Sequence, residues 1–260
     1  MTQVICVASA KAGDSKSTTV FALAAAAAAH GSVLALDMDP QISLTVQMKV
    51  PTTGPTIADV LTGKIGLAEA VYDTPGGIMM VAGSREIHLM DQSPEMVKEA
   101  LDAAMDMVDT ILIDTQPLLA TLSDPMRFAD KIVIPSILDS VSMPVTSDTI
   151  KLALQEGVGD RIAGVLSSNV KRPLTRLAKE LYKSLLECGV GYESVMWQTV
   201  QWPTAVSEGS LAGYPGLQEM AQAVYAETMR RSCDVEQLQR YVDIWDRWLK
   251  DREAEGVSTG

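Results

Sequence analysis

The sequence predicts a doubly wound α/β fold, in which a mostly parallel sheet carries helices on both faces. Apolar runs of strand length alternate with segments of helical length along most of the chain. The chain is 47% hydrophobic but only 5% aromatic, so its core must be aliphatic, as is typical of buried parallel strands. Several apolar runs end on an aspartate, and 260 residues are enough to bury a sizeable core.

The N-terminal part predicts one βαβ unit. Gln3–Ala8 is an apolar run typical of a buried strand, and a loop of small and polar residues follows it. A helix is expected from Lys16 to about His30, where Gly31 stops it. Ser32–Leu36 is expected to form the next strand. Elements in this order give two parallel strands joined by a right-handed crossover.

The alternation of strands and helices continues to about residue 231. Further strands are expected at Gly77–Ala82, Thr110–Asp114, Lys131–Pro135, Arg161–Ser167 and Ser194–Val200. Further helices are expected at Pro94–Asp106, Ser147–Gln155, Lys171–Gly189 and Leu217–Arg231. No linker or composition change interrupts residues 1–231, so we expect them to form one domain.

The C-terminal part, residues 232–260, has a different pattern. Between Asp234 and Arg252 apolar residues recur at helical spacing among charges of both signs, which predicts an amphipathic helix. Trp245 and Trp248 share one face of this helix. We expect that face to dock on the parent domain. A helix that binds a partner or braces a dimer is the alternative.

The charge of the chain argues against general nucleic-acid binding. Its net charge is −12, so nucleic acid repels the chain as a whole. One stretch is an exception, because only Glu180 opposes its basic residues. These residues are Arg161, Lys171, Arg172, Arg176, Lys179 and Lys183, of which the last five are the candidate DNA contacts. A solvated helix face explains the same stretch equally well.

Nothing in the sequence indicates export or a membrane. The first residues lack the basic segment that opens a signal peptide, and no apolar run has membrane-spanning length. Cys6, Cys188 and Cys233 lie far apart and in no metal-binding spacing, which is typical of reduced thiols. We therefore expect a cytoplasmic protein.

The loop after the first strand has the residues that a phosphate site needs. Backbone N–H groups at a helix N-terminus bind phosphate, a lysine reaches the β- and γ-oxygens, and a hydroxyl ligates Mg²⁺. Lys16, Ser17 and Thr18 supply these side chains at the start of the first helix. Compared with the pattern G-x-x-x-x-G-K-[ST], however, Ala10 and Ser15 occupy the two glycine positions.

Carboxylates at strand ends support the phosphate site. Asp37 and Asp39 follow the second strand, and the strand Ile111–Ile113 runs directly into Asp114. The carboxyl ends of parallel strands meet at one edge of a sheet, so these aspartates are expected beside the loop. A carboxylate there can hold the water shell of Mg²⁺.

Two segments resemble the ParA/MinD family of ATPases. Residues 11–18, Lys-Ala-Gly-Asp-Ser-Lys-Ser-Thr, resemble its deviant Walker A loop, K-G-G-x-G-K-[ST]-T, and Asp37-Met38-Asp39-Pro40-Gln41 resembles the D-x-D-P-Q segment of ParA partition proteins. Weaker similarity extends over Ile111–Pro117, Lys131–Pro135 and Ala205–Gly209. The resemblance covers about residues 3 to 215 and is closest to short-form ParA proteins, which lack an N-terminal helix-turn-helix module. The expected fold is therefore a P-loop NTPase of the deviant Walker A type with a C-terminal amphipathic helix.

The resemblance implies a role for each matching residue. Lys11 would be the signature lysine that reaches the ATP of a partner subunit, and Asp39 would orient or activate the attacking water. The loop residues Gly13, Asp14, Ser15, Lys16, Ser17 and Thr18 would bind the nucleotide, with Asn169 near its adenine. Ser17, Asp37 and Asp114 would hold Mg²⁺ directly or through water. ATP and Mg²⁺ are thus the expected ligands.

Several residues depart from the family pattern. Ala12 and Ser15 replace glycines that let the backbone approach phosphate or a partner subunit, and Asp14 adds a negative charge beside the phosphates unless its side chain turns away. Gln116 departs from the usual D-x-P-P run. We expect ATP binding to persist and hydrolysis to be slow.

The function implied by the resemblance is a partition or positioning ATPase. ATP would close a homodimer, the dimer would bind non-specific DNA and associate with the nucleoid, and a ParB-like or other adaptor would stimulate hydrolysis. The alternative is a degenerate nucleotide-binding adaptor that recruits a partner through its C-terminal helix. A synthetase of the same superfamily is a third reading, but no substrate-binding constellation supports it.

Overall fold

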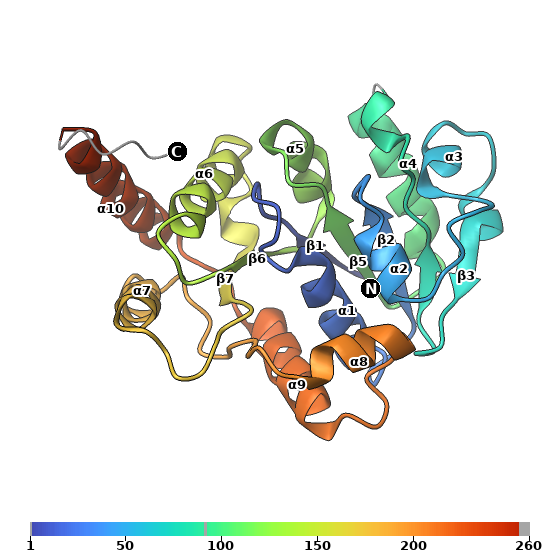
Figure 1. Ribbon diagram of the computed structural model, residues 1–260. Helices are drawn as coiled ribbons and strands as arrows, with labels where there is room; N and C mark the ends of the chain where they lie inside the picture. The colour runs from blue at the N-terminus through green and yellow to red at the C-terminus, as the bar shows by residue number, and fades with distance from the viewer. Residues whose placement is uncertain (1, 91–92, 255–260) are drawn as a thin grey trace.

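A computed structural model, which describes residues 2–90 and 93–254, contains a seven-stranded sheet of order β3-β4-β2-β5-β1-β6-β7 (Figure 1). The strands are β1 (Gln3–Val7), β2 (Val33–Met38), β3 (Val71–Asp73), β4 (Met79–Val81), β5 (Thr110–Thr115), β6 (Lys131–Ser136) and β7 (Ile162–Ser167). All neighbours pair in parallel except β3, which runs antiparallel to β4 at one edge. The predicted doubly wound α/β fold is confirmed.

Helices cover both faces of the sheet (Figure 1). One face carries α4 (Pro94–Met105), α5 (Leu119–Phe128) and α6 (Ser142–Gln155); the other carries α1 (Lys16–Ala27), α8 (Gln201–Glu208) and α9 (Pro215–Arg230). The remaining α-helices are α2 (Ser43–Gln47), α3 (Ile57–Leu61), α7 (Arg176–Glu187) and α10 (Val235–Ala254). Three short 3-10 segments are η1 (Leu67–Ala70), η2 (Ile87–Leu89) and η3 (Gly159–Arg161).

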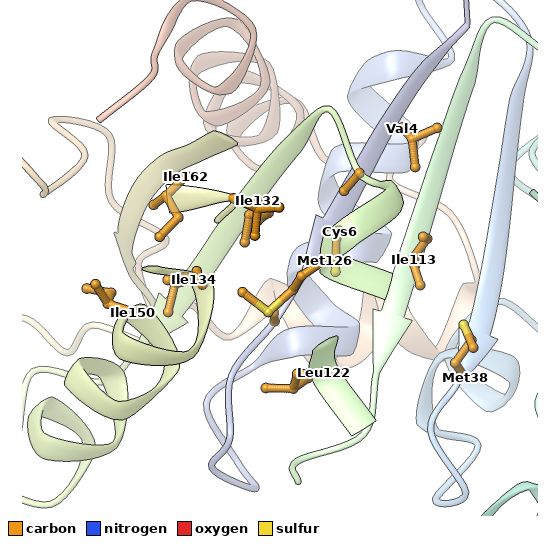
Figure 2. Close-up of a cluster of buried hydrophobic side chains, with 14 of the residues drawn as sticks. Val4, Cys6, Met38, Ile113, Leu122, Met126, Ile132, Ile134, Ile150 and Ile162 are labelled. Atoms are coloured by element: carbon orange, nitrogen blue, oxygen red, sulfur yellow. The ribbon is translucent and has the colours of Figure 1, made fainter. Parts of the chain in front are cut away.

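The core consists of two aliphatic layers, one on each face of the sheet. Every residue of β2, β5 and β7 is buried, because parallel strands covered by helices have no solvent-facing side. Figure 2 shows the layer beneath α5 and α6, where Leu122 and Met126 of α5 and Ile150 of α6 meet side chains of the central strands. The opposite layer packs α1 and α9 against the sheet.

Some predicted elements differ from the observed ones. The predicted strand Ser194–Val200 is wrong, since this segment contributes only an isolated bridge between Val170 and Trp197 before α8 begins. The helix α1 ends at Ala27 rather than near His30, and α7 begins at Arg176 rather than Lys171. The sequence did not predict α5, whose interior contains Pro125.

The C-terminal helix α10 docks on the parent domain. Leu238, Tyr241 and Trp245 are buried in the same layer as α6, and the Lys151 ammonium of α6 lies 2.6 Å from a carboxylate oxygen of Asp246. The backbone also joins the two parts, because Cys233 N–H donates to the carbonyl of Ile162 in β7. Docking, rather than a free partner-binding face, therefore accounts for Trp245. Residues 255–260 of the predicted tail lie outside the described residues.

Two further expectations concern the cysteines and the membrane. Cys6, Cys188 and Cys233 are all buried and unpaired. Over the part of the chain that the structure describes, no helix combines the length and the apolar character needed to cross a bilayer.

Candidate functional site

The loop Lys11–Thr18 lies where three central strands end. It connects β1 to α1, and β1 lies between β5 and β6 in the sheet. The register pairs Val7 of β1 with Asp114 of β5, and Asp114 in turn with Asp37 of β2. The strand-end carboxylates therefore meet at one edge of the sheet, as the sequence predicts.

The loop adopts a strained backbone at a position where the family pattern has glycine. Ser15 has φ 65° and Gly13 has φ 85°, both in the left-handed region. This conformation costs a non-glycine residue about 1–2 kcal/mol. Ser15 is also the N-cap of α1, so this left-handed turn stands directly before the first backbone N–H groups of the helix, which have no partner within a helix. Ser15 thus adopts the backbone conformation that glycine would adopt without strain.

A cleft of about 310 Å³ opens in front of the loop. Its walls combine the loop with the segment after β2, α2 and the residue Pro117 after β5. The lining residues are Ala12, Gly13, Ser15, Lys16, Ser17, Thr18, Asp39, Gln41, Ser43, Gln47 and Pro117. The structure therefore brings most of the predicted loop residues together with Asp39 around one cleft.

Lys16 is a buried lysine that points back into the loop. Its side-chain ammonium donates to the backbone carbonyl of Lys11 at 3.0 Å, and the residue is only 6% exposed. Burial lowers the pKa of Lys16, while the nearby carboxylates of Asp114 and Asp39 act in the opposite direction. An ammonium held in this way has few water partners, so phosphate oxygens would replace a backbone bond rather than a full hydration shell.

Asp114 is a fully buried carboxylate at the end of β5. Among the described residues neither of its oxygens accepts a hydrogen bond of ordinary geometry. Burial and the charge of Asp37 raise the pKa of Asp114 well above its usual value, while the hydroxyl of Ser17 and the ammonium of Lys16 act against this rise. A buried carboxylate of this kind is costly on its own and is stabilised by an added cation.

Asp37 and Asp39 have more partners than Asp114. Asp37 accepts from the Thr45 hydroxyl at 2.6 Å and from the backbone N–H groups of Thr45 and Asp39. Burial nevertheless raises the pKa of Asp37 to about 6. Asp39, at the cleft, accepts from the backbone N–H of Gln41 at 2.8 Å. Ile42 follows with φ 51°, an unfavourable value for a β-branched residue, so this segment is held in place by its contacts.

Asp14 turns away from the cleft and toward the start of α6. It is fully buried and accepts from the hydroxyls of Ser9 at 2.9 Å and Ser142 at 3.2 Å. Lys11 turns the same way: its ammonium donates to the Ser142 hydroxyl at 2.7 Å and lies 3.5 Å from an Asp14 oxygen. The acidic side chain expected to disturb phosphate binding is thus removed from the cleft.

Sequence reasoning missed three residues of this region. Ser43 and Gln47 line the cleft from α2, and Gln47 has a buried side-chain carbonyl oxygen that accepts no hydrogen bond from a described residue. Their i, i+4 spacing directly after the D-x-D-P-Q segment was the available signal. Ser142 carried no local signal, because it reaches the loop from 128 residues further along the chain.

Asn169 is not part of the loop cleft. It is exposed, has φ 50°, and lies with Leu138, Lys171 and Pro173 around a separate hollow of about 330 Å³. The adenine contact expected for Asn169 stays a prediction.

The basic residues of the α7 region are exposed, but several already have partners. Arg176 pairs with Glu180 at 2.9 Å, and Lys183 pairs with Glu187 at 3.3 Å. The Arg172 guanidinium lies 3.9 Å from the centre of the Trp197 ring. Arg161 lies apart from this face, since it donates to backbone carbonyls of residues 127 and 129. Lys171 and Lys179 remain as exposed basic residues of this face.

The residues beside the loop Lys11–Thr18 could bind a divalent cation together with a phosphate ligand. Within residues 2–90 and 93–254, no three His, Cys, Asp or Glu side chains converge to hold a metal on their own. Mg²⁺, however, is usually bound by one or two carboxylates together with substrate phosphates and water. The unpartnered oxygens of Asp114 and the hydroxyl of Ser17 are suitable ligands for that arrangement.

Sheet order, loop and strand-end carboxylates together define a P-loop α/β protein. Residues 2–153 match a protein-family model described as an AAA domain, AAA_31. The match covers more than half of the chain, so the chain belongs to this family, and the resemblance to ParA/MinD ATPases is confirmed.

Two curated relatives match a large part of the chain. A Methanocaldococcus jannaschii protein described as an uncharacterized ATP-binding protein is 28% identical over an alignment of 200 residues, and the match covers 73% of either chain. A protein of Pseudomonas putida is 30% identical over an alignment of 193 residues, and the match covers 70% of this chain and 67% of the relative.

Solved structures share the fold at low sequence identity. A plasmid partition protein of Borrelia burgdorferi with bound AMPPNP has a TM-score of 0.78 at 18% identity, over 88% of this chain and 99% of the other. A variant of Cyanothece McdA in complex with ATP has a TM-score of 0.72 at 19% identity, over 90% and 98%. Cobyrinic acid a,c-diamide synthase of Mycobacterium smegmatis, with an ATP analogue and magnesium, has a TM-score of 0.71 at 21% identity, over 88% and 94%.

Proposed function

We propose that this protein is a ParA-type positioning ATPase that binds Mg·ATP at the loop Lys11–Thr18 and dimerises when the nucleotide is bound. The buried Asp114 carboxylate is the observation that carries the proposal. It has no hydrogen-bond partner among the described residues, and it lies close to Lys16 and Ser17 at the start of α1. A fold has no structural reason to bury such a group, whereas a cation and nucleotide site does.

Different residues around the cleft would bind the phosphates and position the attacking water. Backbone N–H groups from Gly13 to Thr18 would bind the phosphates at the start of α1, and Lys16 would exchange the carbonyl of Lys11 for phosphate oxygens. Asp39, at the cleft, would orient the attacking water. Because phosphoryl transfer depends mostly on positioning and charge neutralisation, these side chains would supply most of what one subunit contributes to hydrolysis. The strained Ser15 and the substituted Ala12 favour slow turnover.

Mg²⁺ would neutralise charge on the phosphates. Ser17 would ligate it directly, and Asp114 would hold its water shell. Asp37 would assist, since its oxygens retain lone pairs beyond the bonds from Thr45 and Asp39.

Dimerisation would complete the site through Lys11. This lysine is positioned at the loop but makes its contacts with Ser142 and Asp14 rather than with the cleft. Leu118 and Val46 are next in sequence to the cleft residues Pro117 and Gln47, Val141 is next to Ser142, and each of the three is more than half exposed. Exposed aliphatic side chains around a polar site are typical of a surface that closes against a partner. A second copy would bring its Lys11 to the nucleotide.

Cargo positioning would use DNA and an adaptor protein. The exposed face of α7 is the candidate for non-specific DNA, with Lys171 and Lys179 as its unpaired charges in the described part of the chain. Fold neighbours described as partition proteins support this class of function. A cytoplasmic, nucleoid-associated location would follow from it.

Calorimetry and light scattering test the proposal together. Wild-type protein should bind Mg·ATP and shift from monomer to dimer, and Lys16→Ala should do neither. Phosphate release should be slow and should rise with DNA and an adaptor. Binding and dimerisation with no phosphate release under any condition would instead favour the adaptor function, and absence of Mg·ATP binding would contradict the proposal as a whole.

A further inference from the structure

We propose that Asp14 is a positioning residue that, together with Ser142, holds Lys11 within its own subunit until nucleotide binds. The inference rests on the proposed function, because it concerns how Lys11 becomes available to a second copy. It assigns a role to Asp14, which stands where the family's loop pattern allows any residue.

The ammonium of Lys11 contacts Ser142 and Asp14. Its ammonium donates to the hydroxyl of Ser142, the first residue of α6, at 2.7 Å. The same ammonium lies 3.5 Å from Asp14 Oδ1, and the Lys11 side chain is only 23% exposed. A lysine on a free loop would keep its ammonium in water. Here the side chain is ordered against α6 and away from the cleft.

Asp14 is fixed firmly enough to act as an anchor. The Ser9 hydroxyl donates to Oδ2 at 2.9 Å, and the Ser142 hydroxyl donates to Oδ1 at 3.2 Å. The Ser168 hydroxyl, from the segment after β7, donates to the backbone carbonyl of Asp14 at 3.1 Å. Three separate elements thus hold this buried residue, so it cannot follow Lys11 when the lysine turns toward a partner.

Release of Lys11 has an electrostatic cost. If its ammonium leaves, the hydrogen-bond donors that remain to the buried Asp14 carboxylate among the described residues are the hydroxyls of Ser9 and Ser142. A buried carboxylate that loses its ion-pair partner is destabilised, because less positive charge then offsets its desolvation. The contacts of Lys11 with Ser142 and Asp14, which we call the hold, therefore oppose dimerisation, because the free energy needed to break them must be supplied when the dimer forms.

Nucleotide binding can loosen the hold through Lys16. The Lys16 ammonium donates to the backbone carbonyl of Lys11 at 3.0 Å, so the two lysines are linked by one hydrogen bond. Phosphate oxygens that attract Lys16 would break this bond and free the backbone at Lys11. Asp14 and Lys16 thus make Lys11 available mainly in the nucleotide-bound state.

Acylation of lysine in the nucleotide-free protein tests the hold directly. The full chain is treated with an N-hydroxysuccinimide ester of acetic acid, and mass spectrometry follows Lys11 relative to the exposed Lys179. Asp14→Asn keeps the side-chain shape and removes its charge, so Lys11 should be acylated about tenfold faster than in wild type. Ser142→Ala should raise the rate as well, without any change in the loop sequence.

Ser147→Ala is the matched control. Ser147 is a buried serine of the same helix, and its hydroxyl has no hydrogen-bond partner among the described residues. Its replacement should leave the acylation rate of Lys11 unchanged. Wild-type rates in both Asp14→Asn and Ser142→Ala, or an equal rise in Ser147→Ala, would overturn the proposal. If Asp14→Asn fails to fold, Ser142→Ala against Ser147→Ala decides the question.

Dimerisation with Mg·ATP tests the consequence. Asp14→Asn should lower the dimer dissociation constant about tenfold, and this gain should disappear in a Lys11→Ala background. An unchanged constant, or an equal gain without Lys11, would show that the hold does not limit dimerisation. If wild type does not bind ATP, the proposed function fails, while the acylation rates still decide whether Asp14 holds Lys11.

Discussion

The loop Lys11–Thr18 and the basic face of α7 were both predicted from charged residues, but their charged side chains have different surroundings in the structure. At the loop, side chains from β2, β5 and α1 converge on one edge of the sheet, and Asp114 accepts no hydrogen bond of ordinary geometry from a described residue. On α7, Arg176 and Lys183 are paired with acids one turn away. Strand ends fix where a side chain must lie, whereas a helix surface lets neighbouring charges neutralise one another.

The largest effect is expected at the loop. Lys16→Ala removes the ammonium that would bind the phosphates, so the dissociation constant for Mg·ATP should rise about 100-fold. Isothermal calorimetry measures this. Lys179→Ala, which removes an exposed lysine of α7, is the control and should bind as wild type does. If both variants bound Mg·ATP equally weakly, the loop would not be the nucleotide site that distinguishes it from α7.

Asp114→Asn should separate function from stability. In the presence of ATP, loss of the carboxylate should weaken the affinity for Mg²⁺ by about 10- to 100-fold, as is typical for residues that support a metal from its outer shell. Without ATP, the variant should unfold at higher temperature, because burial disfavours the charge of Asp114; a gain of about 1–3 kcal/mol is expected. A metal titration and a melting curve check both parts. A loss of stability would mean that Asp114 has a structural partner.

The sequence predicts the site residues at strand ends better than it predicts the partners of other charged residues. Asp37, Asp39 and Asp114 were predictable because apolar strands end at fixed points. The direction of Asp14 was not, since it depends on Ser142, which lies 128 residues further along the chain. The pairing of Lys183 was also missed, because Glu187 lies beyond the basic stretch.

The fold was predictable to a similar extent. Fully buried strands such as β2 and β5 have a continuous apolar signal. The helix α5 lacks one, because Pro125 interrupts it and Leu119 at its start is exposed. Ser194–Val200 has the composition of a strand but makes only one bridge, since the neighbouring strand β7 has already ended at Ser167.

A smaller effect is expected on α7. If this face binds DNA, its association constant should fall as the salt concentration rises. In the double variant Lys171→Ala with Lys179→Ala, the slope of log K against log[salt] should be shallower by about 2, since two phosphate contacts are lost. Arg176→Ala with Lys183→Ala should reduce it less, because Glu180 and Glu187 already offset these charges. Fluorescence anisotropy with random duplex DNA and ATP measures the slope. Absence of binding at low salt would leave α7 as a solvated helix face.

The smallest effect concerns backbone strain in the loop. Ser15→Gly should relieve the left-handed conformation at φ 65°, and the net gain in unfolding free energy should be about 1 kcal/mol after the added chain entropy of glycine. Urea unfolding measures it. Ser194→Gly, at a loop serine outside the positive-φ set, should lower stability instead. A loss in both variants would indicate that Ser15 is not strained.

The central claim is that nucleotide at the loop Lys11–Thr18 joins two copies of this chain. Light scattering after gel filtration, with Mg·ATP and without, measures it for wild type and Lys11→Ala. We predict a dimer for wild type only in the presence of Mg·ATP and a much weaker dimer for Lys11→Ala. A wild-type protein that binds Mg·ATP and stays monomeric, or a Lys11→Ala variant that dimerises as wild type does, would contradict the account.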